Sequence, residues 1–286
     1  FDGSRAAMDA VRYLSHLSFL TEAQVVLLHI FSPLPDYYWD MEGYSDPVLY
    51  SERLSGVLRM ERESRDAVES RLETAKGILT AAGYGEGAVE IQIVDRKQGF
   101  ARDIIDTARE GFDFLFIGRK GLSNMEPCLL GGVTMKLMQN IDFIPLVLVG
   151  QSSPSRRALI ALDGSPCASR ALSLTGTLLM GSDFDLTLIH VVRGQGPEAF
   201  LEVASNWGKE IFTSAESALP GGKLQNKILS GERSRSEAIV HEADINGYGT
   251  IVVGRKGLSD VKHFYTGRVC HKIANLAVRQ AVWICN

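Results

Sequence analysis

Two loops of this chain combine glycines and cations in a pattern that suits the binding of a small anion. The segment GRKGLS occupies 118–123 after the apolar run FLFI, and it recurs at 254–259 after TIVV. A third glycine follows ten residues after the second in each copy, at Gly131 and Gly267. Glycines allow close backbone approach to a ligand, and a helix N-terminus after the last glycine favours phosphate. The cations that could neutralise a phosphate are Arg119, Lys120, Arg255 and Lys256.

The alternative is that both loops are ordinary strand-to-helix turns with solvated cations. Two copies with the same spacing favour the binding interpretation over this one. A phosphate loop of the G-x4-G-K-[ST] type is not present, because the nearest window, 249–255, lies within an expected strand and lacks the lysine.

The loops belong to a repeat that fills the chain. FDGS at 1–4 matches LDGS at 162–165, a shift of 163 − 2 = 161 residues, and LLHIF matches LIHVV at the same shift. The glycine loops are shifted by 254 − 118 = 136, so the first copy carries 161 − 136 = 25 extra residues between these motifs. We therefore predict two domains, 1–150 and 151–286, joined by the short linker GQSSPS.

Each copy alternates apolar strands with helical patterns, which indicates parallel sheets covered on both faces. In the second copy a strand at 157–162 leads through Asp163-Gly-Ser-Pro into a helix, which Ser165 can cap. We predict an α/β fold of two tandem doubly wound domains, each with a five-stranded parallel sheet flanked by helices. The first strand of the first copy would lie upstream of Phe1. The DGS turns and glycine loops would then meet at the carboxyl ends of the strands, where such folds bind ligands.

Composition limits the classes of function. The 286 residues carry a net charge of −4 with 45% hydrophobic residues, which does not suit a nucleic-acid-binding protein. No apolar run approaches the roughly 20 residues of a membrane helix. Four scattered cysteines without paired spacing favour reduced thiols and a cytoplasmic location, although the absence of a leader is provisional because the chain opens at Phe1.

The DGS turns, the LLHI and LIHV strand ends and the G-x2-G-x9-G loops, in this order, resemble the universal stress protein family over essentially the whole chain. The resemblance implies an adenine nucleotide, ATP or a relative, with Mg²⁺ or Mn²⁺ arriving on its phosphates. It implies that Asp2 and Asp163 face the adenosine and that backbone at Ile30 and Val191 contacts the adenine. The residues that would wrap ribose and phosphates are Gly118, Arg119, Gly121, Gly131, Gly132, Gly254, Arg255, Gly257, Gly267 and Arg268.

The sequence departs from the family pattern after the last glycine, where nucleotide-binding members usually have serine or threonine. Gly132 keeps the backbone donor but lacks the hydroxyl, although Thr134 is near, and Arg268 brings charge but also bulk. These departures favour the first half slightly as the nucleotide site. They also leave open a scaffold of the same fold that binds no nucleotide.

No nucleophile–base or carboxylate pair can be assigned from spacing. His29 and His190 are expected to be structural, hydrogen-bonded near the crevice, and no motif predicts a bound metal. We therefore expect a stress-response protein that signals through an unidentified protein partner and is not an enzyme, with slow ATP hydrolysis as the least favoured alternative.

The extra residues and the last strands suggest where the protein makes contacts. The insertion, 36–65, is aromatic and acidic at first and then helical, which fits a solvated connection, a partner-binding projection or a lid over one crevice. The last strands, 145–150 and 281–286, are short and apolar and invite edge pairing. We predict an intrachain pseudo-dimer of the two halves, with a homodimer of whole chains as a further option.

Overall fold

The computed structural model describes residues 1–34, 47–120, 130–151, 155–179, 182–194, 198–218, 224–231, 234–258 and 266–286. The first half contains α1 (Arg5–Ser15), η1 (Ser18–Leu20), β1 (Val25–Phe31), α3 (Pro47–Ala81), η2 (Glu86–Ala88), β2 (Val89–Asp95), α4 (Phe100–Ala108), β3 (Leu115–Gly118), α5 (Gly132–Asn140) and β4 (Leu146–Val149). The second half contains β5 (Arg157–Ala161), α6 (Pro166–Leu179), β6 (Asp185–Arg193), α7 (Glu198–Ala218), β7 (Leu224–Gly231), α8 (Arg235–Ile245), β8 (Thr250–Gly254), α9 (Arg268–Leu276) and β9 (Ala281–Cys285).

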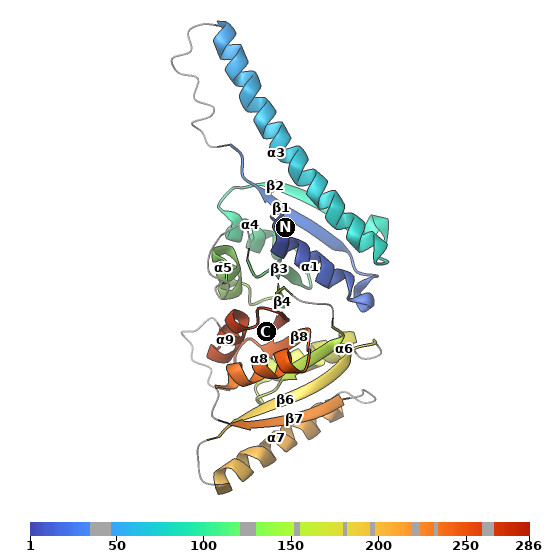
Figure 1. Cartoon of the computed structure of the whole chain (residues 1–286), viewed down its shortest axis with the longest axis vertical. Coiled ribbons are helices and arrows are strands. Elements are labelled where there is room, and N and C mark those ends of the chain that lie inside the picture. Colours follow the sequence, from blue (N-terminus) through green and yellow to red (C-terminus); the bar gives the residue numbers. More distant parts are fainter. Residues whose placement is uncertain are drawn as a thin grey trace.

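One seven-stranded sheet runs through both halves in the order β3-β4-β9-β8-β5-β6-β7. Its neighbours are parallel except β4 and β9, which pair antiparallel with Leu146 opposite Ile284. The halves are stacked along the long axis, with the C-terminus near their junction (Figure 1). The expected pairing of the two last strands is therefore present within one chain.

The prediction of an α/β fold with parallel sheets flanked by helices is confirmed. The second half has five strands, β9-β8-β5-β6-β7, all parallel to one another. The described part of the first half has four strands. They form two separate parallel pairs, β1 with β2 and β3 with β4. Among the described residues no strand lies between β1 and β3.

The strands alternate their side chains between two apolar layers. Val147, Ile160 and Trp283 point into the layer formed with α1, α3, α6 and α7. Leu148 and Leu159 point into the opposite layer, formed with α5, α8 and α9. This period-two alternation of wholly buried positions is what a sheet covered on both faces requires.

The DGS turns that precede α1 and α6 have the same geometry. Gly3 and Gly164 have φ of 74° and 77°, which a residue with a side chain rarely adopts. The hydroxyl oxygen of Ser4 accepts a hydrogen bond from the N–H of Ala7 at 3.1 Å, and Ser165 caps α6 in the same way. Each helix therefore begins at the predicted serine cap.

A buried polar group joins the halves in the layer that contains α1. The Nε1–H of Trp283 donates to the hydroxyl of Tyr13 at 2.8 Å, and this hydroxyl also lies 2.8 Å from Oγ1 of Thr250. Tyr13 belongs to the first half and both partners belong to the second. Because buried polar groups need partners, this group fixes how α1 sits on β8 and β9.

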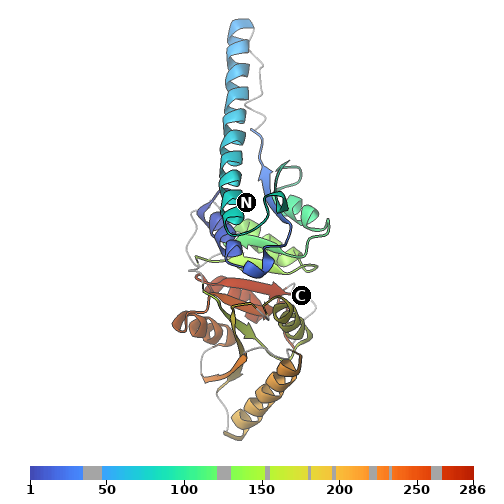
Figure 2. The ribbon, with the colours of Figure 1, turned by 90° about the vertical axis from the view of Figure 1, so that its right-hand side faces the viewer.

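Helix α3 projects from the first half as a long arm (Figures 1 and 2). Its 35 residues correspond to about 50 Å at 1.5 Å per residue. Leu72 and Leu79 near its C-terminal end are fully buried, whereas Leu58 and Met60 further out are exposed. The predicted helix of the insertion is present, and the aromatic and acidic segment 36–46 before it lies outside the described residues. Within the described ranges no helix combines the length and apolarity needed to cross a membrane.

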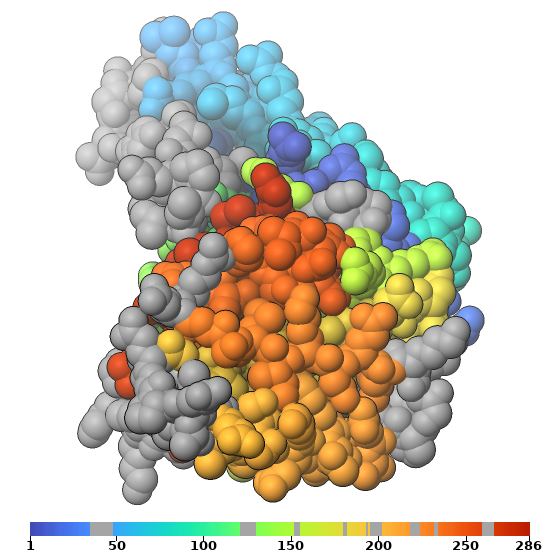
Figure 3. Space-filling view, turned by 60° about the horizontal axis from the view of Figure 1, so that its bottom comes forward, coloured from blue at the N-terminus to red at the C-terminus, as the bar shows by residue number. Residues whose placement is uncertain are grey.

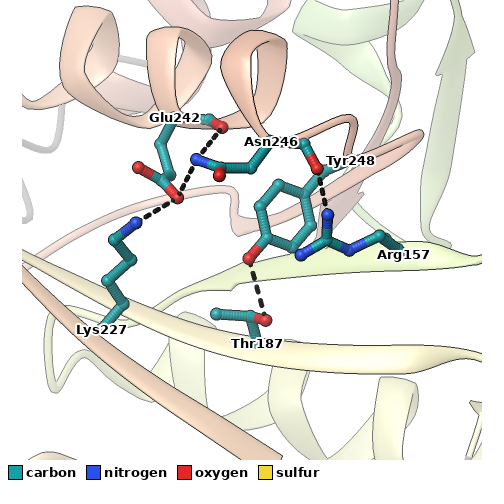
Figure 4. Close-up of polar contacts among 6 residues, drawn as sticks. All are labelled: Arg157, Thr187, Lys227, Glu242, Asn246 and Tyr248. Carbon is teal, nitrogen blue, oxygen red and sulfur yellow. Dashed lines mark hydrogen bonds and ion pairs between the residues drawn. The ribbon is translucent and has the colours of Figure 1, made fainter.

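A second polar cluster lies at the other end of the second-half strands from their carboxyl ends. The buried carboxylate of Glu242 accepts from Nζ of Lys227 at 2.6 Å and from Nδ2 of Asn246 at 2.7 Å. Arg157 donates to the carbonyl of Asn246 and stacks 4.6 Å from the ring of Tyr248 (Figure 4). This cluster links β5, β7 and the end of α8, so the second half is stabilised at both ends of its sheet.

Candidate functional site

A cavity of about 520 Å³ opens at the carboxyl ends of β5, β6 and β8. The chain leaves β5 toward α6 on one side of the sheet, and it leaves β8 toward α9 on the other. Such a switch point leaves a crevice beyond the strand ends. Its volume lies in the range of small-molecule sites. Seen from the second-half end, α7, β7 and α8 cover the surface and α3 rises behind them (Figure 3).

Asp163 lies at the edge of this cavity, held by its own turn. Its Oδ1 accepts a hydrogen bond from the N–H of Ser165 at 3.0 Å. The hydroxyl of Ser165 donates to the carbonyl of Lys256 at 3.2 Å, so the turn after β5 is tied to the loop after β8. The two motifs that the sequence predicts to meet are therefore in contact.

The glycines of the second loop occupy positions with different structural requirements. A Cβ on Gly254 would lie 2.7 Å from the backbone nitrogen of Ala168, so this glycine lets β8 pack against α6. A Cβ on Gly257 would lie 2.6 Å from Oδ2 of Asp163, so this glycine lets the loop approach the carboxylate. Gly267 is the N-cap residue of α9. All three glycines line the cavity, and Gly254 serves helix packing as well.

One wall of the cavity combines apolar strand ends with two rings. Val191, near the end of β6, lines it beside Ile189. Nδ1 of His190 lies 2.8 Å from the carbonyl oxygen of Leu162, so Nδ1 carries the proton and donates. The ring of Trp207 stands edge-on to this imidazole at 5.5 Å between centroids. The expectation that His190 is hydrogen-bonded near the crevice is confirmed, and Trp207 supplies a large flat surface there.

The described lining is strongly cationic. It holds five basic residues and one acidic residue, Asp163. The backbone N–H groups in the first turn of α9 add positive dipole ends, because a helix has no internal acceptors for them. A cavity of this character attracts anions. The basic residues are Arg235, Arg255, Lys256, Arg268 and Lys272.

Arg119 and Arg255 differ from the expectation that both guanidinium groups face a phosphate. Both side chains are buried, at 5% and 3% exposure. Nη1 of Arg255 donates to the carbonyl of Met138 in the first half at 2.7 Å. Arg119 donates in the same way to carbonyls at the end of α9. These hydrogen bonds direct the two charges across the junction between the halves, so we leave both arginines out of the proposed phosphate contacts.

The first half holds the residues that match Asp163, Gly254 and Val191. Oδ1 of Asp2 accepts from the N–H of Ser4 at 2.9 Å, as Asp163 does in its own turn. A Cβ on Gly118 would lie 2.5 Å from the carbonyl carbon of Ala6, so this glycine also serves packing. Ile30 is buried near the end of β1.

Gly131 is the N-cap residue of α5 and Gly132 its first residue, as predicted. The hydroxyl of Thr134 donates to the carbonyl of Gly118 at 3.2 Å, so it supports the loop base instead of a phosphate. Gly121 lies outside the described residues. The cavity described above is lined by second-half residues. The slight preference for the first half stays a prediction, because residues 121–129 of its loop lie outside the described residues.

His29 makes the same type of hydrogen bond as His190, its counterpart in the second half. Its Nδ1 lies 2.6 Å from the carbonyl oxygen of Phe1, and burial lowers the pKa of this imidazole below its ordinary value. A neutral ring with the proton on Nδ1 is therefore favoured. This contact confirms the structural role expected for His29.

Several lining residues were not anticipated. Trp207 reaches the cavity from α7, a helix whose face cannot be chosen from sequence alone. Arg235 follows the capping serine of α8, and Lys272 lies four residues after Arg268 on α9, a spacing that could have signalled a shared helix face. Among the described residues no group of three or more His, Cys, Asp or Glu is placed to hold a metal ion.

Comparisons with known proteins agree with this geometry. The model of the universal stress protein family matches residues 1–149 and 154–282. The chain is 27% identical over 199 residues to the universal stress protein Slr1230 of a Synechocystis strain. This alignment covers 68% of the chain and 64% of that protein, so the chain spans less than two thirds of its relative.

Two further relatives match different shares of the chain. The universal stress protein YxiE of Bacillus subtilis is 26% identical over 137 residues, which are 42% of this chain and 93% of that protein. The crystal structure of a universal stress protein from Archaeoglobus fulgidus covers 100% of the chain and 96% of its own, with a TM-score of 0.63 and 19% identity. That likeness supports the fold. Because the family model accounts for nearly the whole chain in two successive matches, the chain belongs to the universal stress protein family.

Proposed function

We propose that the second half of this chain binds an adenine nucleotide, ATP or a relative, in the cavity between β5, β6, β8 and α9. The observation that carries the proposal is the cavity itself, about 520 Å³ at the strand-end switch point with five basic lining residues and one acidic. The cavity supports a nucleotide-sized polyanion, and the choice of adenine comes from the family resemblance.

The groups of a nucleotide have matching partners in this cavity. Phosphates would lie at the first turn of α9 near Lys256, Arg268 and Lys272, where dipole and charge act together. The base would lie against the apolar end of β6 beside Val191, with Trp207 at the rim. Asp163 is placed to accept a hydrogen bond from a ribose hydroxyl. A divalent cation would arrive with the phosphates.

The proposed role is signalling through partner proteins, without catalysis. The described lining offers Asp163 as its one carboxylate, and Oδ1 of that group is engaged by its own turn. Turnover of ATP that is lost in Asp163→Ala would favour a slow hydrolase instead.

A scaffold that binds no nucleotide is the second candidate. Its support is specific, since Arg119 and Arg255 of the signature loops serve the junction between the halves. Arg268 decides between the two candidates. If its charge serves phosphate, Arg268→Ala weakens binding, whereas the scaffold predicts no binding in either form.

The test uses Trp207, which is 40% exposed at the cavity, as a fluorescent reporter. ATP with Mg²⁺ is titrated into the wild type, Lys272→Met and Lys136→Met, the last being the matching position of α5. We expect saturable quenching that Lys272→Met weakens about fivefold, as for one charge near a phosphate, while Lys136→Met leaves it unchanged. The absence of fluorescence quenching and of a calorimetric heat of binding up to millimolar ATP would contradict the proposal.

A further inference from the structure

Arg119 belongs to the signature loop of the first half, but its side chain ends in the second. Its Nη1 donates to the carbonyl of Ala277 at 2.7 Å and also to that of Ala274. Its Nη2 donates to the carbonyl of Asn275 at 2.7 Å. Three carbonyls at the C-terminal end of α9 thus share one buried guanidinium group.

These contacts are the ones that a helix C-terminus lacks. The last four carbonyls of a helix have no intrahelical donor, and the helix dipole favours a positive charge there. Arginine offers five N–H donors in a planar fork, so one side chain can serve several carbonyls. Arg119 therefore fixes both the position and the direction of the end of α9.

The base of the loop that carries Arg119 is fixed as well. The N–H of Arg119 donates to the carbonyl of Val149 at 3.1 Å, and its carbonyl accepts from the N–H of Gly131 at 3.0 Å. The guanidinium group is therefore mounted on an anchored backbone, which a positioning residue needs.

The other end of α9 forms part of the cavity. Gly267, Arg268 and Lys272 line it, and α9 has only nine residues, so about 13 Å separate its two ends. A helix this short moves as a rigid body. A shift at Arg119 would therefore reach the cavity wall.

The second half repeats the arrangement in the opposite direction. Nη1 of Arg255 and Oγ1 of Thr266 both donate to the carbonyl of Met138 near the end of α5, at 2.7 and 3.3 Å. Nε of Arg255 donates to Oδ1 of Asn286 at 2.5 Å. Each half therefore sends a loop arginine to helix-end carbonyls of the other half, so these reciprocal contacts belong to the junction as a whole and not to one side chain.

From these contacts we infer that Arg119 is a positioning residue for the second-half cavity, acting from the first half by holding α9 in place. The inference deepens the proposed function and rests on it for the ligand. Arg119 does not touch the nucleotide. It sets where the first turn of α9 presents its N–H groups.

The test separates positioning from simple stabilisation of the junction. Arg119→Met removes the charge and keeps much of the bulk, and Arg119→Lys keeps a charge that reaches fewer carbonyls. Tyr13→Phe is the matched control, because it weakens the same junction from the opposite face of the sheet. Hydrogen exchange of the 268–276 segment without nucleotide reads out α9, and quenching of Trp207 by ATP with Mg²⁺ reads out the cavity.

We expect Arg119→Met to speed exchange in 268–276 about tenfold and to weaken ATP binding about fivefold, with Arg119→Lys intermediate. Exchange in 235–245 and the affinity of Tyr13→Phe should stay at wild-type values. Unchanged exchange in α9 would overturn the inference, and so would faster exchange with undiminished ATP affinity. If the wild type binds no ATP, the proposed function fails by itself, and the exchange of α9 alone decides whether Arg119 positions the helix.

Discussion

The two halves of the chain follow the same order of elements, yet they differ at the centre of the sheet. In the second half β5 lies between β6 and β8 and pairs with both. In the described part of the first half no strand lies between β1 and β3, the counterparts of β6 and β8.

Comparing the halves shows which features the repeated motifs support in both of them. Both halves keep the DGS turn, the packing glycines and an arginine that crosses the junction. The halves share only part of the residues that line the cavity. With the shift of 136 residues between the repeats, Gly132 corresponds to Arg268 and Arg71 corresponds to Trp207. The repeated motifs thus maintain the fold and the junction, whereas Arg268 and Trp207 of the second-half cavity have no equivalent side chain at the matching positions of the first half.

The largest effect should come from the junction between the halves. Tyr13→Phe leaves the Nε1–H of Trp283 and the hydroxyl of Thr250 without their shared partner inside the sheet. We expect a loss of about 2 kcal/mol in urea unfolding, the cost of a buried unsatisfied donor. Tyr84→Phe is the matched change within the first half, since that hydroxyl donates only to the carbonyl of Leu14 at 3.0 Å. A loss from Tyr13→Phe no larger than that from Tyr84→Phe would mean that this polar group does not hold the halves together.

The cluster of Figure 4 belongs to the second half alone. Lys227→Met removes the cation beside the buried carboxylate of Glu242. Because the lysine side chain is 40% exposed, solvent screens the pair, and we expect a loss of about 1 kcal/mol. Gln92→Met is the control, since Gln92 pairs with Leu28 as Lys227 pairs with Ile189. Equal effects on the unfolding midpoints of the two variants would remove the distinction between the halves at this end of the sheet.

Alkaline pH should weaken the second half through two buried thiols. Burial raises the pKa of both Cys270 and Cys285 from the ordinary value of 9.0 to about 12. The unfolded thiols ionise near pH 9 and the folded ones do not, so the unfolded state gains stability as the pH rises from 9 toward 12. We expect the free energy of unfolding to be unaffected below pH 8 and to fall across that window under reducing conditions.

The double variant Cys270→Ala, Cys285→Ala should flatten this decline. The first half carries Thr134 and Val149 at the corresponding positions, so it has no thiol to contribute there. An unchanged pH dependence in the double variant would show that other groups, such as Tyr13, whose pKa burial raises to about 12, cause the decline.

Much of the fold could be predicted from the sequence because its signals are local. The serine cap and Pro166 set the start of α6, and α9 begins directly after Gly267, the last glycine of the loop. The alternation of strands and helices predicted that the DGS turn and the glycine loop would meet at the carboxyl ends of the strands. Edge pairing of the last strands followed from their short apolar composition.

The site could be predicted only in part because its remaining features depend on long-range contacts. The guanidinium of Arg119 reaches carbonyls more than 150 positions away in the chain, at Asn275 and Ala277, and loop composition does not encode that direction. Trp207 packs closely against the turn after β5, with 3.2 Å between the indole and a Cβ placed on Gly164, a contact between residues 43 positions apart in the chain. Gly118 and Gly254 have the spacing of ligand-binding glycines, but close helix packing explains them as well.

The most direct measurement is the stoichiometry of ATP binding with Mg²⁺ by calorimetry. It is made on the wild type, on Gly257→Val, whose Cβ would clash with Oδ2 of Asp163, and on Gly87→Val, where a Cβ meets nothing within 4 Å. We predict one site per chain, lost in Gly257→Val and kept in Gly87→Val. Two equivalent sites, or one site that survives in Gly257→Val, would contradict the assignment of nucleotide binding to the second half.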